Sequence, residues 1–450
     1  MKQTEAGRKL AKPACCKVPF RMEGKTIEAL LLRARGLGVL RGALGSPAAR
    51  DLLGLLEVLA APRPDPVSAA DVFGRLWEGL ASGTDRLLPD AWQAHLVGRL
   101  LDDENPFSLG AEGGGLSGAV LEQARLDLGS LRMLFDLDAG TLLGMVEGAA
   151  PELAGIWVPW SDPASPGEDS PRGELARKLA AAGDWGTAAE LLADHFARHG
   201  AGPLGRHRAF RWDGEGLRAV PNPDPVRLDG LISYEREREP LVENTRRFMA
   251  GLPAQHALLY GQPGTGKSST VKALLNEFAD AGLRLVEVAK EDLGSLPRVL
   301  GVLRGRGPRF VLFVDDLSFE EHEVEYKALK ALLEGSLEEP PENVRVYATS
   351  NRRNLIREGF SDREDGDDVH ARDTMQEKQS LSARFGLRVT FPAPDQRRYL
   401  EIVEGLARER GLKVPEEELR EGALMWDRWH AGRSGRTARQ FVDEMEARLS

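Results

Sequence analysis

The sequence predicts an α/β protein with a mostly helical N-terminal region, a core built on a parallel five-stranded sheet, and a small helical C-terminal segment. Residues 21 to about 200 place apolar side chains at helical spacing. From residue 226 onward, short apolar runs alternate with helical patterns, which is typical of a parallel sheet covered by helices on both faces. After Asp395 only the helical pattern remains. We therefore predict three parts, residues 1–225, 226–394 and 395–450.

The N-terminal part has the features of an irregular all-helical domain. One helical face is formed by Leu52, Leu53, Leu56 and Leu59, and the run Pro62–Pro66 breaks the chain after it. A helical hairpin is predicted by two further segments, Glu174–Ala182 and Thr187–His199. No fixed period accompanies this pair, so a helical repeat is the less favoured interpretation. Residues 200–226 are rich in loop-forming residues and predict a linker before the core.

Five short apolar runs in the middle part predict the strands of the sheet. They are residues 258–260, 283–289, 310–314, 344–349 and 387–391. Helical patterns lie between them, at residues 269–279, 295–304 and 322–333. Strands linked in this way run parallel, and their carboxyl ends line a ligand crevice at one edge of the sheet.

Composition narrows the class of protein. With 450 residues, of which 42% are hydrophobic, the chain can build two or three domains with cores. Its formal net charge of −10 supplies no global basic field that would draw it to nucleic acid. The two cysteines, Cys15 and Cys16, are adjacent and provide neither a disulfide framework nor a zinc quartet. The N-terminal residues 1–20 lack an apolar segment, so we expect no signal peptide, and the sequence has no apolar run of the roughly 20 residues that cross a bilayer. We expect a cytoplasmic protein with no membrane partner.

A glycine-rich segment, Gly261–Ser268, fits the phosphate-binding pattern G-x-x-x-x-G-K-[ST] at every fixed position. A predicted strand precedes it and a predicted helix follows it, which is the context that this pattern requires. Backbone N–H groups of such a loop and the N-terminus of the following helix bind phosphate oxygens. Lys267 is expected to reach the β and γ phosphates, and the Ser268 hydroxyl is expected to hold Mg²⁺. The candidate phosphate-binding residues are Gly261, Pro263, Gly264, Thr265, Gly266, Lys267, Ser268 and Ser269. The alternative is a glycine-rich turn followed by a chance Lys-Ser.

Polar residues follow two of the predicted strands. Asp315 and Asp316 come directly after the apolar run 310–314. Phosphoryl transfer needs one acid for the Mg²⁺ shell, a role that suits Asp315, and one that orients the attacking water, a role that suits Asp316. Asn351 follows the strand 344–349 and would lie between these elements, where it could hold the water or sense the γ phosphate. The alternatives are a strand end that caps the next helix and an asparagine that starts a turn.

Two arginines complete the candidate catalytic set. Arg384 precedes the last strand and is a candidate arginine finger, donated to the γ phosphate of a neighbouring subunit. Arg436 opens the last helix and could reach the phosphates from the C-terminal helical segment. Arg433 and Arg439 compete for the same role. The alternative for Arg384 is an ordinary surface arginine.

These motifs, in this order, resemble those of the AAA+ ATPases. The correspondence comprises Walker A (261–268), Walker B (310–316), sensor 1 (Asn351), the arginine finger (Arg384) and sensor 2 (Arg436), and it covers roughly residues 226–450. It implies a three-layer core with a helical lid, ATP and Mg²⁺ as ligands, and a homo-oligomer. It also implies that Leu231 and Ile232 contact the adenine.

Four stretches resemble more narrowly a bacterial family, the domain of unknown function 815. They are Asp315–Glu320, Ala348–Arg353, the run that ends Ser380–Leu387, and Ser434–Phe441. This resemblance implies an ATP-binding AAA+ core that follows a helical N-terminal region of unassigned role.

The sequence departs from the AAA+ pattern at Asp316, where most members have glutamate. The shorter side chain places the carboxylate about one methylene further from the water, which favours slow turnover unless Glu320 assists. A charged segment at residues 361–370 is expected to be a solvated loop that meets a neighbouring subunit. The alternative, a cation site at Asp367, Asp368 and His370, has no clear ligand spacing.

The predicted function is that of an ATP-binding AAA+ protein that hydrolyses ATP with Mg²⁺ to remodel or load an unknown macromolecular partner. A slow nucleotide-gated switch that holds a protein partner is the alternative, because Asp316 stands in place of glutamate. A DNA-associated loader is a third interpretation. The acidic net charge and the absence of a recognisable DNA-reading motif count against it.

Overall fold

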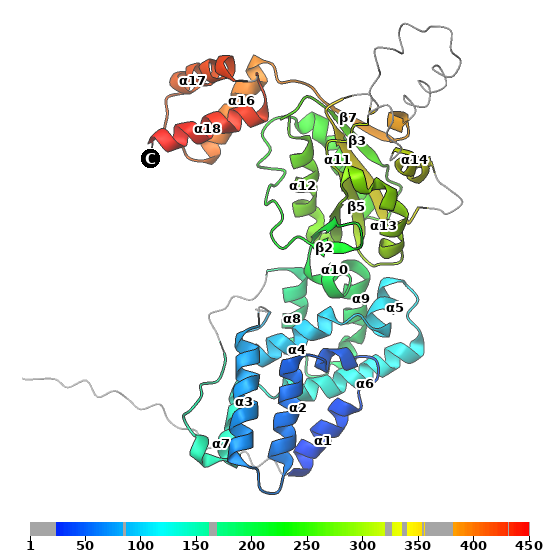
Figure 1. The fold of residues 1–450 in the computed structure, drawn as a ribbon, viewed down its shortest axis with the longest axis vertical. Coiled ribbons are helices and arrows are strands. Elements are labelled where there is room, and N and C mark those ends of the chain that lie inside the picture. Colours follow the sequence, from blue (N-terminus) through cyan, green and yellow to red (C-terminus); the bar gives the residue numbers. More distant parts are fainter. Residues whose placement is uncertain are drawn as a thin grey trace, which may run out of the picture. The chain divides into compact units, whose positions relative to one another are not determined.

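A computed structural model describes residues 24–83, 87–161, 169–319, 326–334, 340–352, 355, 381–430 and 432–449 (Figure 1). The chain divides into two compact units. Unit 1 comprises Met1–Arg99 and Leu126–Gly167, and unit 2 comprises Leu100–Arg125 and Glu168–Ser450. Each unit is described by itself.

Unit 1 is helical, as predicted. Its elements are α1 (Gly24–Arg35), η1 (Arg41–Leu44), α2 (Pro47–Ala60), α3 (Pro66–Ala81), α7 (Ala139–Ala149), η2 (Pro151–Leu153) and parts of α4 (Ala91–Asp102) and α6 (Gly118–Phe135). The predicted break at Pro62–Pro66 is confirmed, because α3 begins with Pro66 directly after Asp65. The Asp65 carboxylate accepts a hydrogen bond from the backbone N–H of Ser68. Proline suits this first helical position because its missing N–H would be unpaired there in any case.

A seven-stranded sheet forms the centre of unit 2, in the order β2-β1-β4-β5-β6-β3-β7. Five strands correspond to the predicted ones and pair in parallel. They are β3 (Ala257–Gly261), β4 (Leu283–Glu287), β5 (Arg309–Val314), β6 (Val344–Ser350) and β7 (Leu387–Phe391). The α/β fold class predicted from the sequence is thereby confirmed.

The prediction of a linker at residues 200–226 is wrong in part. This segment forms the short helix α10 (Gly202–Arg206) and two further strands, β1 (Ala209–Trp212) and β2 (Leu217–Ala219). β1 pairs in parallel with β4, and β2 pairs antiparallel with β1. The physical reason is the pairing of β1 with β4, whose paired residues lie 76 positions further along the chain, as for Ala209 and Leu285. Local sequence patterns do not reveal such a distant pairing.

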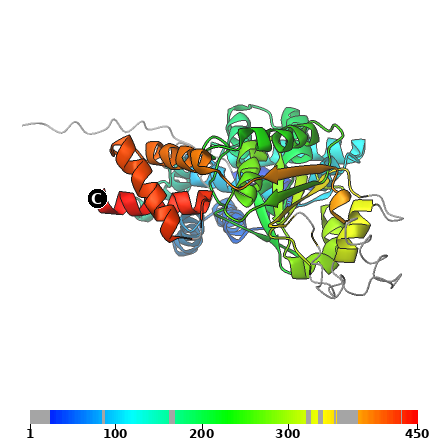
Figure 2. The same cartoon turned by 90° about the horizontal axis from the view of Figure 1, so that it is seen from above.

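Helices cover both faces of the sheet (Figures 1 and 2). Side chains of β5 alternate between two buried clusters: Val311 and Phe313 pack in one, and Phe310, Leu312 and Val314 in the other. The first cluster contains α11 (Glu235–Met249) and α12 (Lys267–Phe278), which η4 (Ala279–Ala281) follows. The second contains η5 (Lys290–Ser295), α13 (Leu296–Leu303) and α14 (Tyr326–Glu334). The alternation has the period of two expected for a strand that is buried on both faces.

Three helices close the chain: α16 (Gln396–Glu409), α17 (Glu416–Trp429) and α18 (Gly435–Leu449). Asp395 caps α16 by accepting a hydrogen bond from the backbone N–H of Arg398. Buried side chains of α16 and α18, among them Ile402 and Phe441, join the same cluster as α11 and α12. Within the described parts of the chain, no helix combines the length and apolar character that crossing a membrane requires.

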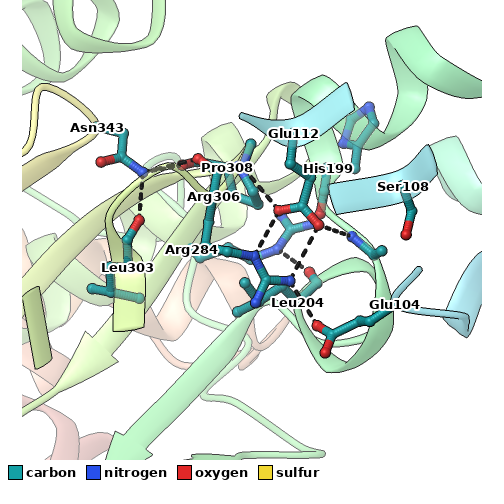
Figure 3. Close-up of polar contacts among 12 residues, drawn as sticks. Glu104, Ser108, Glu112, His199, Leu204, Arg284, Leu303, Arg306, Pro308 and Asn343 are labelled. Atoms are coloured by element: carbon teal, nitrogen blue, oxygen red, sulfur yellow. Dashed lines mark hydrogen bonds and ion pairs between the residues drawn. The ribbon is translucent and has the colours of Figure 1, made fainter. Parts of the chain in front are cut away.

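A smaller helical group of unit 2 is joined to the sheet by buried polar contacts. It comprises α5 (Pro106–Glu112), α8 (Pro171–Ala181), η3 (Gly186–Ala188), α9 (Ala189–His199) and α10, and it confirms the two helices predicted at residues 174–182 and 187–199. The Glu112 carboxylate is fully buried and accepts hydrogen bonds from the Arg306 guanidinium and from the backbone N–H of Gly307 and Ala201 (Figure 3). One carboxylate therefore ties α5 to the loop that precedes β5.

Candidate nucleotide-binding site

A cavity of about 510 Å³ lies where the glycine-rich loop meets the strand ends and the C-terminal helices. Most of the predicted site residues line it: Leu231, Ile232, Pro263, Gly264, Thr265, Gly266, Lys267, Ser268, Ser269, Asp315, Asp316, Asn351 and Arg436. Gly261 and Arg384 do not. Elements that are far apart in the sequence thus converge on one cavity at the carboxyl end of the parallel strands, where open α/β sheets bind ligands.

The glycine-rich loop runs close to its neighbours. Gly261 has φ 148°, and a Cβ atom there would lie 1.9 Å from the carbonyl oxygen of Phe391. Gly264 has φ 76°, and a Cβ atom there would lie 2.9 Å from Ser434 Oγ. These two positions accept glycine alone, the first because β3 lies against β7 and the second because the loop lies against the start of α18.

The N-terminus of α12 is open to the cavity. Its cap residue is Gly266, which supplies no side-chain acceptor for the first N–H groups of the helix. Lys267 is the first helical residue and is only 6% exposed. Its ammonium donates to the carbonyl oxygens of Gly261 and Gln262 at 2.9 and 2.8 Å and to Asn351 Oδ1 at 3.1 Å. Burial lowers the pKa of Lys267, and the nearby Asp316 and Asp315 oppose that shift. A buried cation beside unpaired N–H groups is a site that favours an anion.

Ser268 and Asp315 form a pair of oxygen donors. The Ser268 hydroxyl donates to Asp315 Oδ1 at 2.6 Å. Thr349, at the end of β6, donates its hydroxyl to the same carboxylate oxygen. Hydroxyl and carboxylate oxygens are the ligands that Mg²⁺ uses when it also binds substrate phosphates, so the residues present fit this ion.

Hydrogen bonds hold both the backbone and the side chain of Asp316, and its backbone N–H lies 3.2 Å from Asp315 Oδ1. Its backbone N–H donates to Thr349 Oγ1 at 2.9 Å, and Asn351 Nδ2 donates to its carboxylate at 2.6 Å. The backbone of Asp316 is left-handed, with φ 50°. Aspartate and asparagine adopt this conformation at lower cost than longer side chains do.

An apolar wall lies at the other end of the cavity. Leu231 and Ile232 line it together with Ile402 and Leu406 of α16. The buried Arg238 guanidinium donates to the carbonyl oxygens of Leu231, at 2.7 Å, and of Ser233. Arg238 therefore fixes the backbone of the segment that carries the two predicted adenine contacts.

The structure distinguishes the three arginines that compete for one role. Arg436 and Arg439 both line the cavity, and the backbone N–H of Arg436 donates to the carbonyl oxygen of Gly264. Arg433 instead forms an ion pair with Asp427 at 2.9 Å. The positions of Arg436 and Arg439, three residues apart on α18, bring both side chains to one face of the helix.

Arg384 lies outside the cavity and forms an ion pair with Glu334 of α14. An arginine that acts on a neighbouring subunit would not line the cavity of its own chain, so this placement leaves the predicted role open. Glu320 and the charged segment at residues 361–370, with Asp367, Asp368 and His370, lie outside the described residues.

Sequence analysis missed several residues of this cavity. Thr349 is the most informative, because it bonds to both Asp315 and Asp316. Its signal would have been its position beside Asn351 at a predicted strand end. Ile402 and Leu406 lie four residues apart on an amphipathic helix, a spacing that predicts a shared apolar face but not the cavity that the face lines. Further lining residues are Gly230, Tyr234, Arg238, Thr270, Lys272 and Gly435.

Two curated proteins share part of this sequence. The large subunit of replication factor C from Ignicoccus hospitalis is 35% identical over 80 residues, which are 17% of this chain and 16% of that protein. A homolog of 26S proteasome regulatory subunit 6B from Encephalitozoon cuniculi is 27% identical over 176 residues, which are 35% of this chain and 40% of that protein. The chain thus spans less than half the length of either relative.

Solved structures of RuvB from Thermotoga maritima resemble part of the chain. Two of them have TM-scores of 0.36 and 0.34 with 18% sequence identity, and the matches cover 49% of this chain and 63% of each RuvB chain. One of the two is described as a Holliday junction branch migration motor.

A family model matches residues 205–449, from α10 through the sheet and the cavity to the last helix. The family is described as "Protein of unknown function (DUF815)". The matched segment contains all the motifs on which the predicted AAA+ resemblance rests, and it is more than half of the chain. The protein therefore belongs to the DUF815 family, as its sequence predicts, and is an AAA+ ATPase-like protein.

Proposed function

We propose that this protein binds ATP with Mg²⁺ in the cavity of about 510 Å³ and hydrolyses it to remodel or load a macromolecular partner. The observation that supports this function is the convergence of the phosphate-binding loop, two carboxylates, Asn351 and two arginines of α18 on one cavity. The residues that would bind the triphosphate are those of the loop and the first turn of α12.

Lys267 would exchange hydrogen-bond partners when ATP binds. Its ammonium now donates to two loop carbonyls and to Asn351, and a phosphate oxygen is a stronger acceptor for a desolvated cation than any of these. Ser268 and Asp315 would hold Mg²⁺, which neutralises charge on the β and γ phosphates. Leu231, Ile232, Ile402 and Leu406 would contact the adenine.

Hydrolysis would use Asp316 to orient the attacking water and Asn351 to hold that water or sense the γ phosphate. Arg436, with Arg439 as its competitor, would contact the phosphates from α18. Arg384 would serve the site of a neighbouring copy, which requires a homo-oligomer and release of its ion pair with Glu334. The partner would be a protein that engages the N-terminal residues 1–225. In this proposal, residues 226–394 form the nucleotide-binding core and residues 395–450 form its helical lid.

A slow nucleotide-gated switch is the second candidate function. The hydrogen bond from Asn351 to Asp316, at 2.6 Å, occupies the carboxylate that would have to orient water. The short aspartate side chain limits how far that carboxylate can move. Both features favour ATP binding over rapid turnover.

Calorimetric titration of MgATP into the full chain tests binding, and phosphate release at several protein concentrations tests turnover. We expect the Lys267→Ala variant to lose binding. The matched control is Lys178→Ala, because Lys178 is exposed, does not line this cavity and pairs with its helical neighbour Glu174. Turnover that rises with protein concentration would support the oligomeric ATPase. Tight binding with turnover below about one per minute would support the switch. Absence of ATP binding by the intact chain would refute both.

A further inference from the structure

A second cavity, of about 300 Å³, lies in unit 2 at the opposite end of α12 from the phosphate-binding loop. It is lined by the start of α8, by α9 and α10, by residues that flank β1 and β2, and by the starts of η4 and β4. It shares no lining residue with the nucleotide cavity. The proposed ATPase function does not use this second cavity, so a role for the cavity is independent of that function.

The lining of this cavity is strongly basic. It contains four arginines, Arg172, Arg206, Arg208 and Arg284, against two aspartates, Asp169 and Asp280. Outside the lining, Asp102 pairs with both Arg172, at 2.6 Å, and Arg206. Among the described residues, the four arginines of the lining therefore outnumber the two aspartates of the lining together with Asp102, although the protein as a whole carries a net charge of −10.

Arg284 is a buried cation without a carboxylate partner in the described part of the chain. It is 4% exposed. Its guanidinium donates to four backbone carbonyl oxygens, two of which, at Leu204 and His199, are shown in Figure 3 at 2.7 and 3.0 Å. Burial lowers the pKa of Arg284 to about 10. Carbonyl oxygens satisfy its N–H donors, and the carboxylates of Asp280 and Glu112 offset its charge only in part, without forming an ion pair with it among the described residues.

Two histidines of α9 add neutral donors. His195 and His199 lie four residues apart with ring centroids separated by 4.7 Å. Burial lowers the pKa of His195 to about 3 and that of His199 to about 4, and neighbouring cations contribute to both shifts. At neutral pH each ring therefore carries one N–H donor and no charge.

We propose that this cavity is a binding site for a small phosphoryl anion of about the size of pyrophosphate. Guanidinium groups present paired N–H donors that match the oxygens of a phosphoryl group. An anion would place a negative charge beside Arg284 and would offset the excess of arginines over aspartates in the lining. The volume is at the lower end of the range for small-molecule sites, which favours a compact ligand over a nucleic acid strand.

Calorimetric titration of sodium pyrophosphate into the full chain tests the proposal. The Lys267→Ala substitution is made first, to remove the phosphate-binding loop as a competing site. In that background we expect one pyrophosphate to bind per chain, and more weakly as NaCl is raised. The double substitution Arg206→Gln/Arg208→Gln should weaken binding by about tenfold or more, because it removes two charge-assisted donors. Arg206→Lys/Arg208→Lys keeps the positive charges but removes the planar guanidinium groups. Its affinity for pyrophosphate should lie between that of the Lys267→Ala parent and that of the double glutamine variant.

The matched control is Arg33→Gln, an exposed arginine of unit 1 that lines neither cavity. Thermal unfolding of each variant separates lost binding from lost folding, and Arg208 is exposed, so its substitution should leave the transition in place. Pyrophosphate binding that is equal in the double variant and in Arg33→Gln would overturn the proposal. So would the absence of binding in the Lys267→Ala background, or binding of a single-stranded oligonucleotide where pyrophosphate does not bind.

Discussion

Asn351 and Asp316 are joined by a hydrogen bond of 2.6 Å from the amide nitrogen of the asparagine to the carboxylate of the aspartate. The two residues follow neighbouring parallel strands, β6 and β5, whose register pairs Ala348 with Val314. Parallel pairing therefore brings the residues that follow one strand close to those that follow the other. Two side chains proposed to act on the same water already touch, so a change in either should alter hydrolysis more than binding.

The Asp316→Asn substitution tests this division. Asparagine has the same shape and tolerates the left-handed backbone at φ 50°, so the fold and the affinity for MgATP should change little. It cannot act as a base, so phosphate release should slow by about a hundredfold or more. Calorimetric titration and single-turnover phosphate release measure the two quantities. An equal loss of both would show that Asp316 supports binding, contrary to the proposed role.

Mixing two inactive variants tests whether Arg384 acts on a neighbouring copy. Arg384→Ala should leave ATP binding intact and reduce turnover about a thousandfold if the arginine stabilises transferred phosphate. The Lys267→Ala variant should not bind ATP, but its intact Arg384 should still reach the cavity of a neighbouring copy. A mixture of the two should recover part of the activity, because some interfaces combine an intact cavity with an intact arginine. Failure to recover activity, in mixtures shown to form joint oligomers, would contradict action between subunits.

Removing the buried Glu112 carboxylate should destabilise unit 2. The Glu112→Ala variant leaves the N–H groups of Gly307 and Ala201 without their acceptor and removes the buried partner of Arg306, which keeps its ion pair with Glu104. Breaking one partner of a buried pair costs about 3–5 kcal/mol, which chemical denaturation can measure. The matched control is Arg35→Gln, which breaks the exposed pair with Glu57 and should cost less than about 1 kcal/mol. Equal costs for the two variants would contradict the structural role of Glu112.

His256 should make the core sensitive to mild acid. Its Nδ1 accepts a hydrogen bond from the backbone N–H of Val346 at 3.0 Å, and burial lowers its pKa to about 4 from the usual 6.5. At a pH between about 4 and 6.5, His256 is protonated in the unfolded chain but not in the folded chain. The free energy of unfolding should therefore fall as the pH drops below about 6.5, by up to about 1.4 kcal/mol per pH unit.

Denaturant titrations at pH 6.5 and 5.0 measure this loss. In the His256→Asn variant, Asn Oδ1 can still accept from Val346 but does not titrate, so the dependence on pH should become shallower. His430→Asn, at an exposed position beyond the end of α17, is the control and should keep the dependence of the parent. An unchanged slope in His256→Asn would assign the acid sensitivity elsewhere, for example to the two buried histidines of α9.

The sequence predicts those parts of the fold that local pattern determines. Five strands are recognisable in the sequence as apolar runs, and the loop at 261–268 is recognisable by its glycines. Strands β1 and β2 were missed because they have four and three residues. The pairing of β1 with β4, and of β2 with β1, supplies a stability that the local sequence does not reveal. Such short strands depend on tertiary contacts rather than on propensity.

The same limit applies to the candidate site. Lys267, Asp315 and Asn351 were predicted from motifs, but Thr349 was not, because its contacts depend on the register that sets β6 beside β5. Arg436 could not be separated from Arg433 in the sequence. The structure separates them through the ion pair of Arg433 with Asp427, which lies on a different helix.

The sheet ends in β2 on one side and in β7 on the other. β2 has only three residues, so it offers few backbone groups to a strand of another molecule. β7 is longer, but it turns the exposed side chain of Arg388 outward at its edge. Short or charged edges discourage strands of separate molecules from joining. Copies of this chain should consequently meet through their side chains, and the same edges should protect the protein from fibrous aggregation at high concentration.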